Sequence, residues 1–157
     1  EIIIIKASDV PIYIDSGTID LGIVGLDTLM EDGKNNHFRL YDMTISKCKL
    51  VVAGKAKKKY FNNMKVATKY PRIAKKYFEN IGFQCSILEL YGSIELAPVM
   101  GLSDFIVDIV ETGKTLKENG LKEHDIISNV SSLLIANKVS YKIKRKEIDL
   151  ILDKVNQ

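Results

Sequence analysis

Apolar and polar residues alternate along this chain in blocks, and the blocks switch between the spacing of a strand and that of a helix. The clearest helix is predicted over residues 71–82, because Pro71 suits a first helical turn and Gly82 suits a helix end. One face of that helix would carry Ile73, Ala74, Tyr77, Phe78 and Ile81. Near the start of the chain, the apolar run of residues 2–5 predicts a buried strand.

The same pattern predicts alternating strands and short helices along the rest of the chain. The expected strands cover residues 20–25, 38–43, 47–53, 65–69, 83–90 and 105–110, followed by one long strand or a strand pair over 126–137. The expected helices cover residues 9–17, 27–31 and 94–100, a helical turn ending near 120, and a closing helix with an apolar stripe of Ile148, Ile151, Leu152 and Val155. Such alternation favours an α/β architecture with largely parallel sheets.

Length and composition narrow the classes of function. The 157 residues are enough for one ordinary domain or two small lobes. The net charge of +3 is too small to indicate nucleic-acid binding by itself, but the clustered lysines would suit an anionic substrate. No apolar run approaches the ~20 residues that a membrane span needs. We therefore expect a cytoplasmic protein with neither a membrane nor a nucleic-acid partner.

The cysteines and histidines do not indicate a metal site. Cys48 and Cys85 lack a Cys-x-x-Cys spacing, so we expect two small buried side chains in a reducing compartment. His37 and His124 stand far apart without metal-ligand spacing, and we expect both on the surface or in loops.

The stretch from residue 104 to residue 116 carries the strongest chemical signal. The predicted strand delivers Asp108, and a tight polar loop follows before the next helical turn. Backbone N–H groups at such a turn can bind a phosphate, and glycine lets the backbone approach the anion closely. This 111–115 loop consists of Glu111, Thr112, Gly113, Lys114 and Thr115. The Asp108 carboxylate would accept hydrogen bonds from ribose hydroxyls, so the stretch predicts a phosphoribosyl site.

Simpler interpretations of these residues stay open. The 111–115 loop resembles many plain turns, and it lacks the G-x-x-x-x-G-K-[ST] pattern of a P-loop nucleoside triphosphatase. Ser93 and Glu95 fit either a capped helix start or a helix N-terminus that faces a substrate. The two glycines within residues 20–25 could lie flat against a planar base, although close strand packing explains them more simply.

Five motifs follow one another along the chain. They are Asp9-Val10-Pro11, Asp20-Leu21-Gly22-Ile23-Val24-Gly25, Ala67-Thr68-Lys69-Tyr70-Pro71, Gly92-Ser93-Ile94-Glu95-Leu96-Ala97-Pro98 and Asp108-Ile109-Val110-Glu111-Thr112-Gly113-Lys114-Thr115-Leu116. In this order they resemble the motifs of the ATP phosphoribosyltransferase family. The resemblance continues through residues 118–121 and 137–142 and so covers essentially the whole chain.

The resemblance implies a fold similar to that of type II periplasmic binding proteins, with two α/β lobes and the active site in the cleft between them. One discontinuous lobe would comprise residues 1–46 and 134–157, and the inserted lobe would comprise residues 47–133. The numbering starts without Met and inside the predicted first strand, so we expect an N-terminal part of the first lobe to be missing from it.

The resemblance also implies an activity, which is transfer of the phosphoribosyl group of phosphoribosyl pyrophosphate to N1 of ATP. This glycosyl transfer, the first step of histidine biosynthesis, gives phosphoribosyl-ATP and pyrophosphate, and Mg²⁺ would arrive with the pyrophosphate substrate without dedicated protein ligands. Asp108 and the 111–115 loop would bind phosphoribosyl pyrophosphate, and Lys6 and Glu95 would be catalytic. ATP would bind at Asp20, Leu21, Gly22, Gly25 and Ser93.

The resemblance is to the short form of the family, which works with a regulatory subunit similar to histidyl-tRNA synthetase. We also expect the catalytic chains to form a homodimer. Two alternatives remain. A type I phosphoribosyltransferase also places acids before such a loop, but typically two adjacent ones, whereas Ile109 and Val110 separate Asp108 from Glu111 here. A non-catalytic module of the same fold would only bind a small solute.

Overall fold

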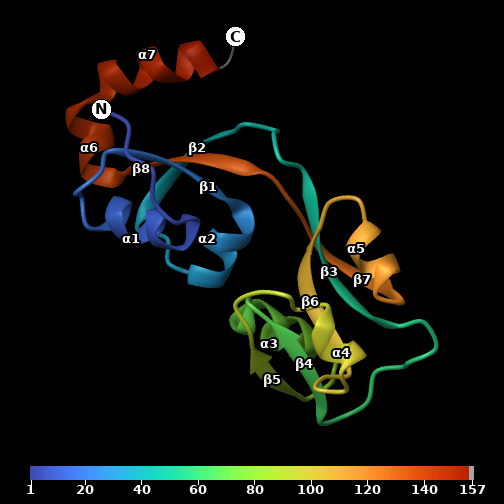
Figure 1. Cartoon of the computed structure of the whole chain (residues 1–157). Helices are drawn as coiled ribbons and strands as arrows, with labels where there is room; N and C mark the ends of the chain where they lie inside the picture. The colour runs from blue at the N-terminus through green and yellow to red at the C-terminus, as the bar shows by residue number, and fades with distance from the viewer. Residues whose placement is uncertain (156–157) are drawn as a thin grey trace. The chain divides into compact units, whose positions relative to one another are not determined.

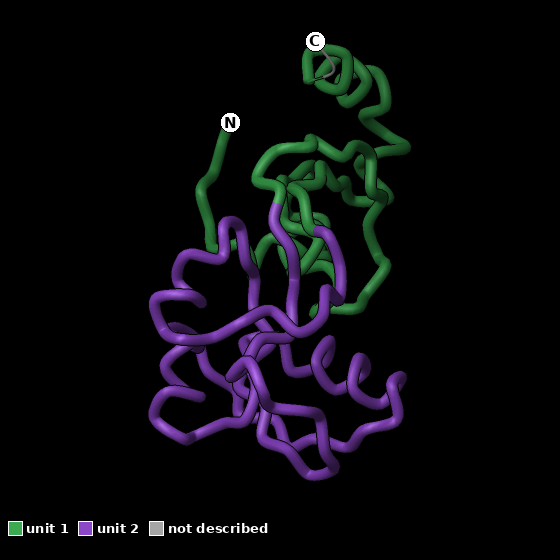
Figure 2. Tube along the Cα trace, turned by 90° about the vertical axis from the view of Figure 1, so that its right-hand side faces the viewer, with its two compact units in different colours: residues 1–47, 130–157 green, residues 48–129 purple. Residues whose placement is uncertain are grey.

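The computed structural model describes residues 1–155, and the chain divides into two compact units. Unit 1 comprises residues 1–47 and 130–157, and unit 2 comprises residues 48–129 (Figure 2). No helix in the described part of the chain is both long enough and apolar enough to span a membrane.

Unit 1 is built on a three-stranded antiparallel sheet in the order β1–β8–β2. Its strands are β1 (Leu21–Gly25), β2 (His37–Asp42) and β8 (Ser132–Asn137). The short 3-10 helix η1 (Ala7–Asp9) leads into α1 (Val10–Asp15), and α2 (Leu26–Asp32) follows β1 and ends at Gly33 with φ 66°. Side chains from α1, α2 and the sheet form one core of Val10, Ile14, Val24, Leu29, Leu133 and Ile135.

Two helices close unit 1 where the sequence predicted one. They are α6 (Lys138–Ile143) and α7 (Arg145–Val155), drawn in orange-red at the end of the chain in Figure 1. The side chain of Asn137 caps α6, because its Oδ1 accepts hydrogen bonds from the N–H groups of Val139 (2.9 Å) and Ser140 (3.0 Å). On α7, Ile148 is buried as the predicted stripe requires, whereas Ile151 is exposed.

Unit 2 is built on a five-stranded mixed sheet in the order β5–β4–β6–β3–β7 (Figure 1). Its strands are β3 (Cys48–Lys55), β4 (Met64–Thr68), β5 (Cys85–Glu89), β6 (Phe105–Val110) and β7 (Leu121–Val130). Its helices are α3 (Pro71–Asn80), α4 (Leu96–Val99) and α5 (Lys114–Glu118). Strand β4 runs parallel to β5 and β6, whereas β3 runs antiparallel to β6.

The core of unit 2 joins the sheet to the segments around α4 and α5. Helix α3 contacts β4 and β5, and it buries Ile73, Ala74 and Phe78 of its predicted apolar face. The cluster that includes α4 and α5 side chains consists of Val51, Ala53, Ala67, Ile94, Ala97, Ile106, Val110, Leu116 and Leu121. This packing fixes the carboxyl end of β6, where the candidate site lies.

The expectation of largely parallel sheets was wrong. Unit 1 is antiparallel throughout, and unit 2 is mixed. The spacing of apolar residues indicates which face of a strand is buried, but it does not indicate whether the neighbouring strand runs parallel or antiparallel. In unit 1, β1 and β2 both pair with β8, which lies about a hundred residues further along the chain, and short-range alternation does not carry that information.

The predicted strand over residues 2–5 is also absent. Ile2 and Ile4 are 94% and 95% exposed, and only Ile5 packs partly against the core of unit 1. An apolar run favours a strand, but its backbone groups need a pairing partner, and no described strand pairs with this segment.

Three further expectations need correction. His37 is buried in β2, with its Nδ1 3.0 Å from Oδ1 of Asp15, and His124 is half-buried in β7 with its ring centroid 5.3 Å from that of Phe105. Neither is a surface or loop residue, because an imidazole buries readily when a carboxylate or an aromatic ring contacts it. Cys48 and Cys85 are half-buried rather than fully buried.

Candidate functional site

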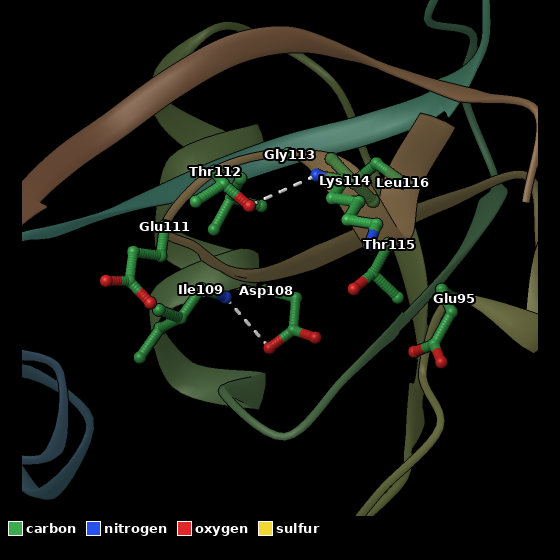
Figure 3. Close-up of a pocket in the computed structure, with 10 residues that line it drawn as sticks. Glu95, Asp108, Ile109, Glu111, Thr112, Gly113, Lys114, Thr115 and Leu116 are labelled. Carbon is green, nitrogen blue, oxygen red and sulfur yellow. Dashed lines mark hydrogen bonds between the residues drawn. The ribbon is translucent and has the colours of Figure 1, made fainter. Parts of the chain in front are cut away.

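A cavity of about 340 Å³ lies where β6 meets the 111–115 loop (Figure 3). All of its lining residues come from unit 2, from position 95 and from the continuous run 108–116. They are Glu95, Asp108, Ile109, Val110, Glu111, Thr112, Gly113, Lys114, Thr115 and Leu116. The structure therefore brings together seven of the residues that the sequence predicted for the site: Glu95, Asp108 and the whole 111–115 loop.

The local sequence explains the shape of the loop. Buried Val110 and Leu116 hold its two ends in the core of unit 2. Between them Gly113 adopts φ 71°, a left-handed conformation that glycine accepts without the steric penalty of a Cβ. The Oγ1 of Thr112 accepts a 3.4 Å hydrogen bond from the backbone N–H of Lys114, which closes the turn and starts α5.

The exposed groups of the loop are suited to an anion. Glu111, Thr112, Lys114 and Thr115 are all exposed, so both threonine hydroxyls are accessible. The first N–H groups of a helix have no intrahelical acceptor and attract negative charge, although α5 has only five residues and a correspondingly small dipole. The Lys114 ammonium lies 3.9 Å from Oε1 of Glu118, so the carboxylate partly offsets its positive charge.

Asp108 supplies the carboxylate at the base of the cavity. Burial raises its pKa above the usual value, whereas a hydrogen bond from the N–H of Ile109 (2.8 Å) and the positive charge of Lys69 lower it, and Glu95 raises it. That backbone N–H is the one hydrogen-bond donor to this carboxylate among the described residues. The residue is nevertheless half-buried and faces the cavity, so its carboxylate remains accessible to a ligand.

The helix that follows Ser93 starts later than predicted. Helix α4 begins at Leu96, and Glu95 occupies the N-cap position without a capping hydrogen bond from its side chain. Ser93 is exposed and has φ 49°, and its carbonyl oxygen accepts a 3.1 Å hydrogen bond from the N–H of Leu96. Ser93 is therefore not the cap of this helix, because its left-handed backbone forms a turn ahead of α4.

None of the residues predicted for the ATP side lines this cavity: Ser93 lies in unit 2, and the other four lie in unit 1. The carboxylate of Asp20 accepts a 2.7 Å hydrogen bond from Nζ of Lys144, and this bond holds its pKa below the usual value. A Cβ added to Gly22 would lie 2.7 Å from Cγ1 of Val10, so this glycine is needed for close packing of β1 on α1.

The other unit 1 candidates show no convergence on the cavity either. A Cβ at Gly25 would lie 2.2 Å from Oδ1 of Asp27, which makes Gly25 a packing position too. Leu21 is half-buried in β1, and Lys6 is exposed at the start of η1. In this segment the structure supports the interpretation of close packing.

The sequence analysis missed one residue next to the cavity. Lys69 directly follows β4, and its charge acts on Asp108. The signal that could have identified it is its position at the end of a predicted buried strand that neighbours β6. Within the described residues, no group of three or more histidine, cysteine, aspartate or glutamate side chains could hold a metal ion.

Fold and cavity together define an α/β protein with a strand–loop–helix turn and an accessible carboxylate in one cavity. Comparison with known proteins specifies the family. The chain belongs to the ATP phosphoribosyltransferase family, whose model matches residues 6–157. The chain is 49% identical to the ATP phosphoribosyltransferase of Clostridium novyi, over all of this chain and 75% of that protein, and 45% identical to that of a Marinomonas species, over 74% of that protein.

Solved structures agree with this assignment. The chain is similar to one in the ATP phosphoribosyl transferase (HisG:HisZ) complex from Thermotoga maritima, with a TM-score of 0.92 and 37% identity over 98% of this chain and 76% of that one. A second similar structure is Tv2483 bound to L-arginine, with a TM-score of 0.63 and 17% identity over 97% of this chain and 66% of that one. At that identity the second likeness concerns the fold alone.

Proposed function

We propose that this chain transfers the phosphoribosyl group of phosphoribosyl pyrophosphate to N1 of ATP, giving phosphoribosyl-ATP and pyrophosphate, the first step of histidine biosynthesis. The observation that carries the proposal is the joint presence of Asp108 and the 111–115 loop in one cavity of a member of this family. An acceptor for a ribose diol and a set of donors for a phosphate match the two ends of a phosphoribosyl group.

In this proposal the loop binds the 5-phosphate of the donor through its backbone N–H groups and the hydroxyls of Thr112 and Thr115. Asp108 accepts hydrogen bonds from the ribose hydroxyls. The lone pair of adenine N1 attacks ribose C1, the bond from C1 to the pyrophosphate oxygen breaks, and pyrophosphate leaves with the Mg²⁺ that it brought. Catalysis rests on positioning and on stabilising charge at the sugar and the leaving group. Glu95 lines the same cavity and faces the developing cation of the sugar.

The acceptor side of the proposal rests on unit 1. We infer that ATP meets Asp20, Leu21, Gly22, Gly25 and Ser93 in a cleft between two lobes, with Lys6 near the leaving group. The lobes would comprise residues 1–46 with 134–157, and residues 47–133. This cleft is the one that a fold of the type II periplasmic-binding-protein kind would provide, because ligand sites often form where two domains meet.

The proposed partners follow from the solved relative. That protein forms a complex with HisZ, and we infer that this chain also binds a regulatory subunit of the kind similar to histidyl-tRNA synthetase. We further propose a homodimer of catalytic chains in the cytoplasm. Size-exclusion chromatography with light scattering tests the homodimer, and co-purification with the regulatory subunit tests the complex.

One incubation separates this function from its alternatives. The protein is mixed with ATP and Mg²⁺–phosphoribosyl pyrophosphate, and the product is identified by mass spectrometry. Phosphoribosyl-ATP is the expected product. A phosphoribosylated nucleobase formed from a free base, but not from ATP, would favour a type I-like enzyme. Binding of substrate without any product, with or without the regulatory subunit, would favour a solute-binding module.

The variant Asp108→Asn serves as the matched negative sample in this assay. It keeps the volume of the side chain but trades one of its two acceptors for a donor. Loss of product with this variant, together with an unchanged far-ultraviolet circular dichroism spectrum, ties the activity to the cavity.

A further inference from the structure

Strand register places Lys69 beside Asp108. Strands β4 and β6 are parallel neighbours, with Ala67 opposite Ile106 and Thr68 opposite Val107. One residue further along the sequence, Lys69 follows Thr68 and Asp108 follows Val107. Since side chains alternate between the faces of a sheet, Asp108 points to the same face as Ile106 and its neighbour Ala67. Those two residues belong to the core cluster that also holds Val110 and Leu116, the two ends of the 111–115 loop.

Two hydrogen bonds of the buried Thr68 hydroxyl fix the backbone on both sides of Lys69. Thr68 is fully buried, and its Oγ1 donates a 2.7 Å hydrogen bond to the carbonyl oxygen of Val107, the residue before Asp108. The same Oγ1 accepts a 2.9 Å hydrogen bond from the N–H of Tyr70. One hydroxyl thus ties the end of β4 to β6 on one side and to the start of α3 on the other.

The ring of Tyr70 supports the ammonium group of Lys69. Tyr70 is buried, and Nζ of Lys69 lies 4.9 Å from its ring centroid. A cation over an aromatic face at this distance is attracted by the negative face of the ring. Lys69 is itself exposed, so its charge is accessible from solvent while its position is restrained.

The charges around Asp108 explain why a cation matters there. Glu95 lines the cavity from the segment before α4, and Glu111 and Lys114 line it from the loop. Glu95 raises the pKa of Asp108, as burial does, and the ammonium of Lys114 lies close to Glu118 instead. Lys69 is the cation among the described residues that lowers the pKa of Asp108.

From this geometry we propose that Lys69 is a positioning residue of the cavity: its ammonium group supplies the positive charge that the Asp108 carboxylate needs to accept hydrogen bonds from a ribose diol. The inference rests on the proposed function, because it concerns the donor site of that reaction. A half-buried carboxylate beside other carboxylates gains a proton easily, and the protonated group is a poorer acceptor for two hydroxyls. Lys69 opposes that loss and adds attraction for the anionic donor.

The test compares Lys69→Met, Lys69→Gln and Lys69→Arg with Lys65→Met as the matched control. Lys65 lies on the same strand and is exposed, but it is four residues away, about 13 Å along the strand. The first readout is the pKa of the Asp108 carboxyl, measured by carbon-detected nuclear magnetic resonance in the protein without substrate. The second is the affinity for Mg²⁺–phosphoribosyl pyrophosphate between pH 5 and pH 8, measured by calorimetry.

In the Met and Gln variants we expect the Asp108 pKa to rise, as loss of a neighbouring opposite charge requires. The acidic limb of the binding profile should move to higher pH by the same amount. Lys69→Arg should restore both values, and Lys65→Met should change neither. A purely structural lysine would lower affinity equally at every pH, and would leave the carboxyl titration unchanged.

The two readouts separate this inference from the proposed function. An unchanged Asp108 titration in both charge-removing variants overturns the role of Lys69, even if the wild type binds the donor. Conversely, a wild type that does not bind the donor at any pH overturns the proposed function, while the titration still decides whether Lys69 controls Asp108.

Discussion

The 111–115 loop of unit 2 and strand β1 of unit 1 use glycine in opposite ways. In the loop, Gly113 is required by its own backbone conformation, φ 71°, and the groups around it are exposed and line a cavity. In β1, Gly22 is required by its neighbours, since a Cβ there would lie 2.7 Å from Val10. A glycine next to an acidic residue therefore indicates a ligand site only when the surrounding space is open. This comparison predicts that substitutions in β1 change stability, whereas substitutions in the loop change binding.

The largest expected effect is on the stability of unit 1. Gly22→Val adds side-chain volume against Val10 and Ile14, and we expect the free energy of unfolding to fall by about 3 kcal/mol, the upper part of the range for overpacking. Urea denaturation followed by circular dichroism measures it. Gly92→Ala is the control, because no atom lies within 4 Å of a Cβ built there. If Gly22→Val is as stable as Gly92→Ala, the packing explanation for β1 is wrong.

The next effect is on ligand binding at Asp108. In Asp108→Asn we expect affinity for phosphoribosyl pyrophosphate to fall by about 2 kcal/mol, roughly thirtyfold, the value for a hydrogen bond to a charged group. Calorimetry at pH 7.5 checks this. Asp153→Asn, a change on the exposed side of α7, should bind like wild type. If Asp108→Asn and Asp153→Asn bind phosphoribosyl pyrophosphate with equal affinity, Asp108 does not contact the ligand.

The same variant should have the opposite effect on stability. Burial raises the pKa of Asp108 in the folded chain above its unfolded value near ~3.9. A raised carboxyl pKa stabilises the fold below the unfolded pKa, and this contribution is lost as the pH rises through the folded pKa. Asp108→Asn removes the titration, so its stability relative to wild type should increase from pH 4 to pH 7. Chemical denaturation at several pH values in that range measures the free energy of unfolding of both proteins. If the two free energies changed in parallel with pH, the burial argument would be wrong.

Smaller effects are expected from the threonines of the loop. Thr112→Ala and Thr115→Ala should each weaken binding of phosphoribosyl pyrophosphate by ~1 kcal/mol or more through a lost charge-assisted hydrogen bond. Both residues are exposed, so stability should change by less than ~0.5 kcal/mol in Thr115→Ala. Thr112→Ala also loses the hydrogen bond that closes the turn, so its stability should fall by about 0.5 kcal/mol or slightly more. Thr18→Ala, in an exposed turn of unit 1, is the control. If both loop variants bind phosphoribosyl pyrophosphate with the wild-type affinity, the phosphate does not bind at this loop.

The smallest effect concerns the ion pair on α5. Lys114 and Glu118 are an exposed i,i+4 pair whose charged atoms lie 3.9 Å apart. Glu118→Gln should therefore change the unfolding free energy by no more than a few tenths of a kcal/mol. The variant also frees the Lys114 ammonium, so donor affinity should rise slightly at low salt. A loss of affinity would show that Glu118 itself supports the loop.

The sequence predicted most helices and strands because the spacing of apolar residues depends on which side of each element is buried. The strand of residues 105–110 and the part of the α3 face formed by Ile73, Ala74 and Phe78 follow from spacing and terminal residues, and the structure confirms them. Strand direction in unit 1 could not be predicted, since it depends on pairing with β8. The burial of His37 likewise depends on Asp15, a contact between residues of different elements.

For the candidate site, the contiguous part was predictable and the converging part was not. Asp108 and the 111–115 loop are neighbours in sequence, so their grouping in one cavity follows from a strand, a turn and a helix start. Lys69 does not line the cavity but acts on Asp108 because β4 pairs with β6, and a single sequence does not specify which strands are adjacent. The roles assigned to Asp108, Glu95 and the 111–115 loop stay predictions, as do those assigned to Asp20, Leu21, Gly22, Gly25, Ser93 and Lys6.

Every lining residue of the cavity falls within a span of the sequence from Glu95 to Leu116, and all but Glu95 belong to the continuous run 108–116. Genetic recombination with a breakpoint outside this stretch would transmit the lining intact, whereas a frame-preserving insertion or deletion within it would shift Asp108 relative to the loop. The lining of the cavity can therefore be inherited as one segment of the gene, whereas Lys69 lies outside that segment. Lineages that exchange the flanking sequence would keep the lining and could change the charge beside Asp108.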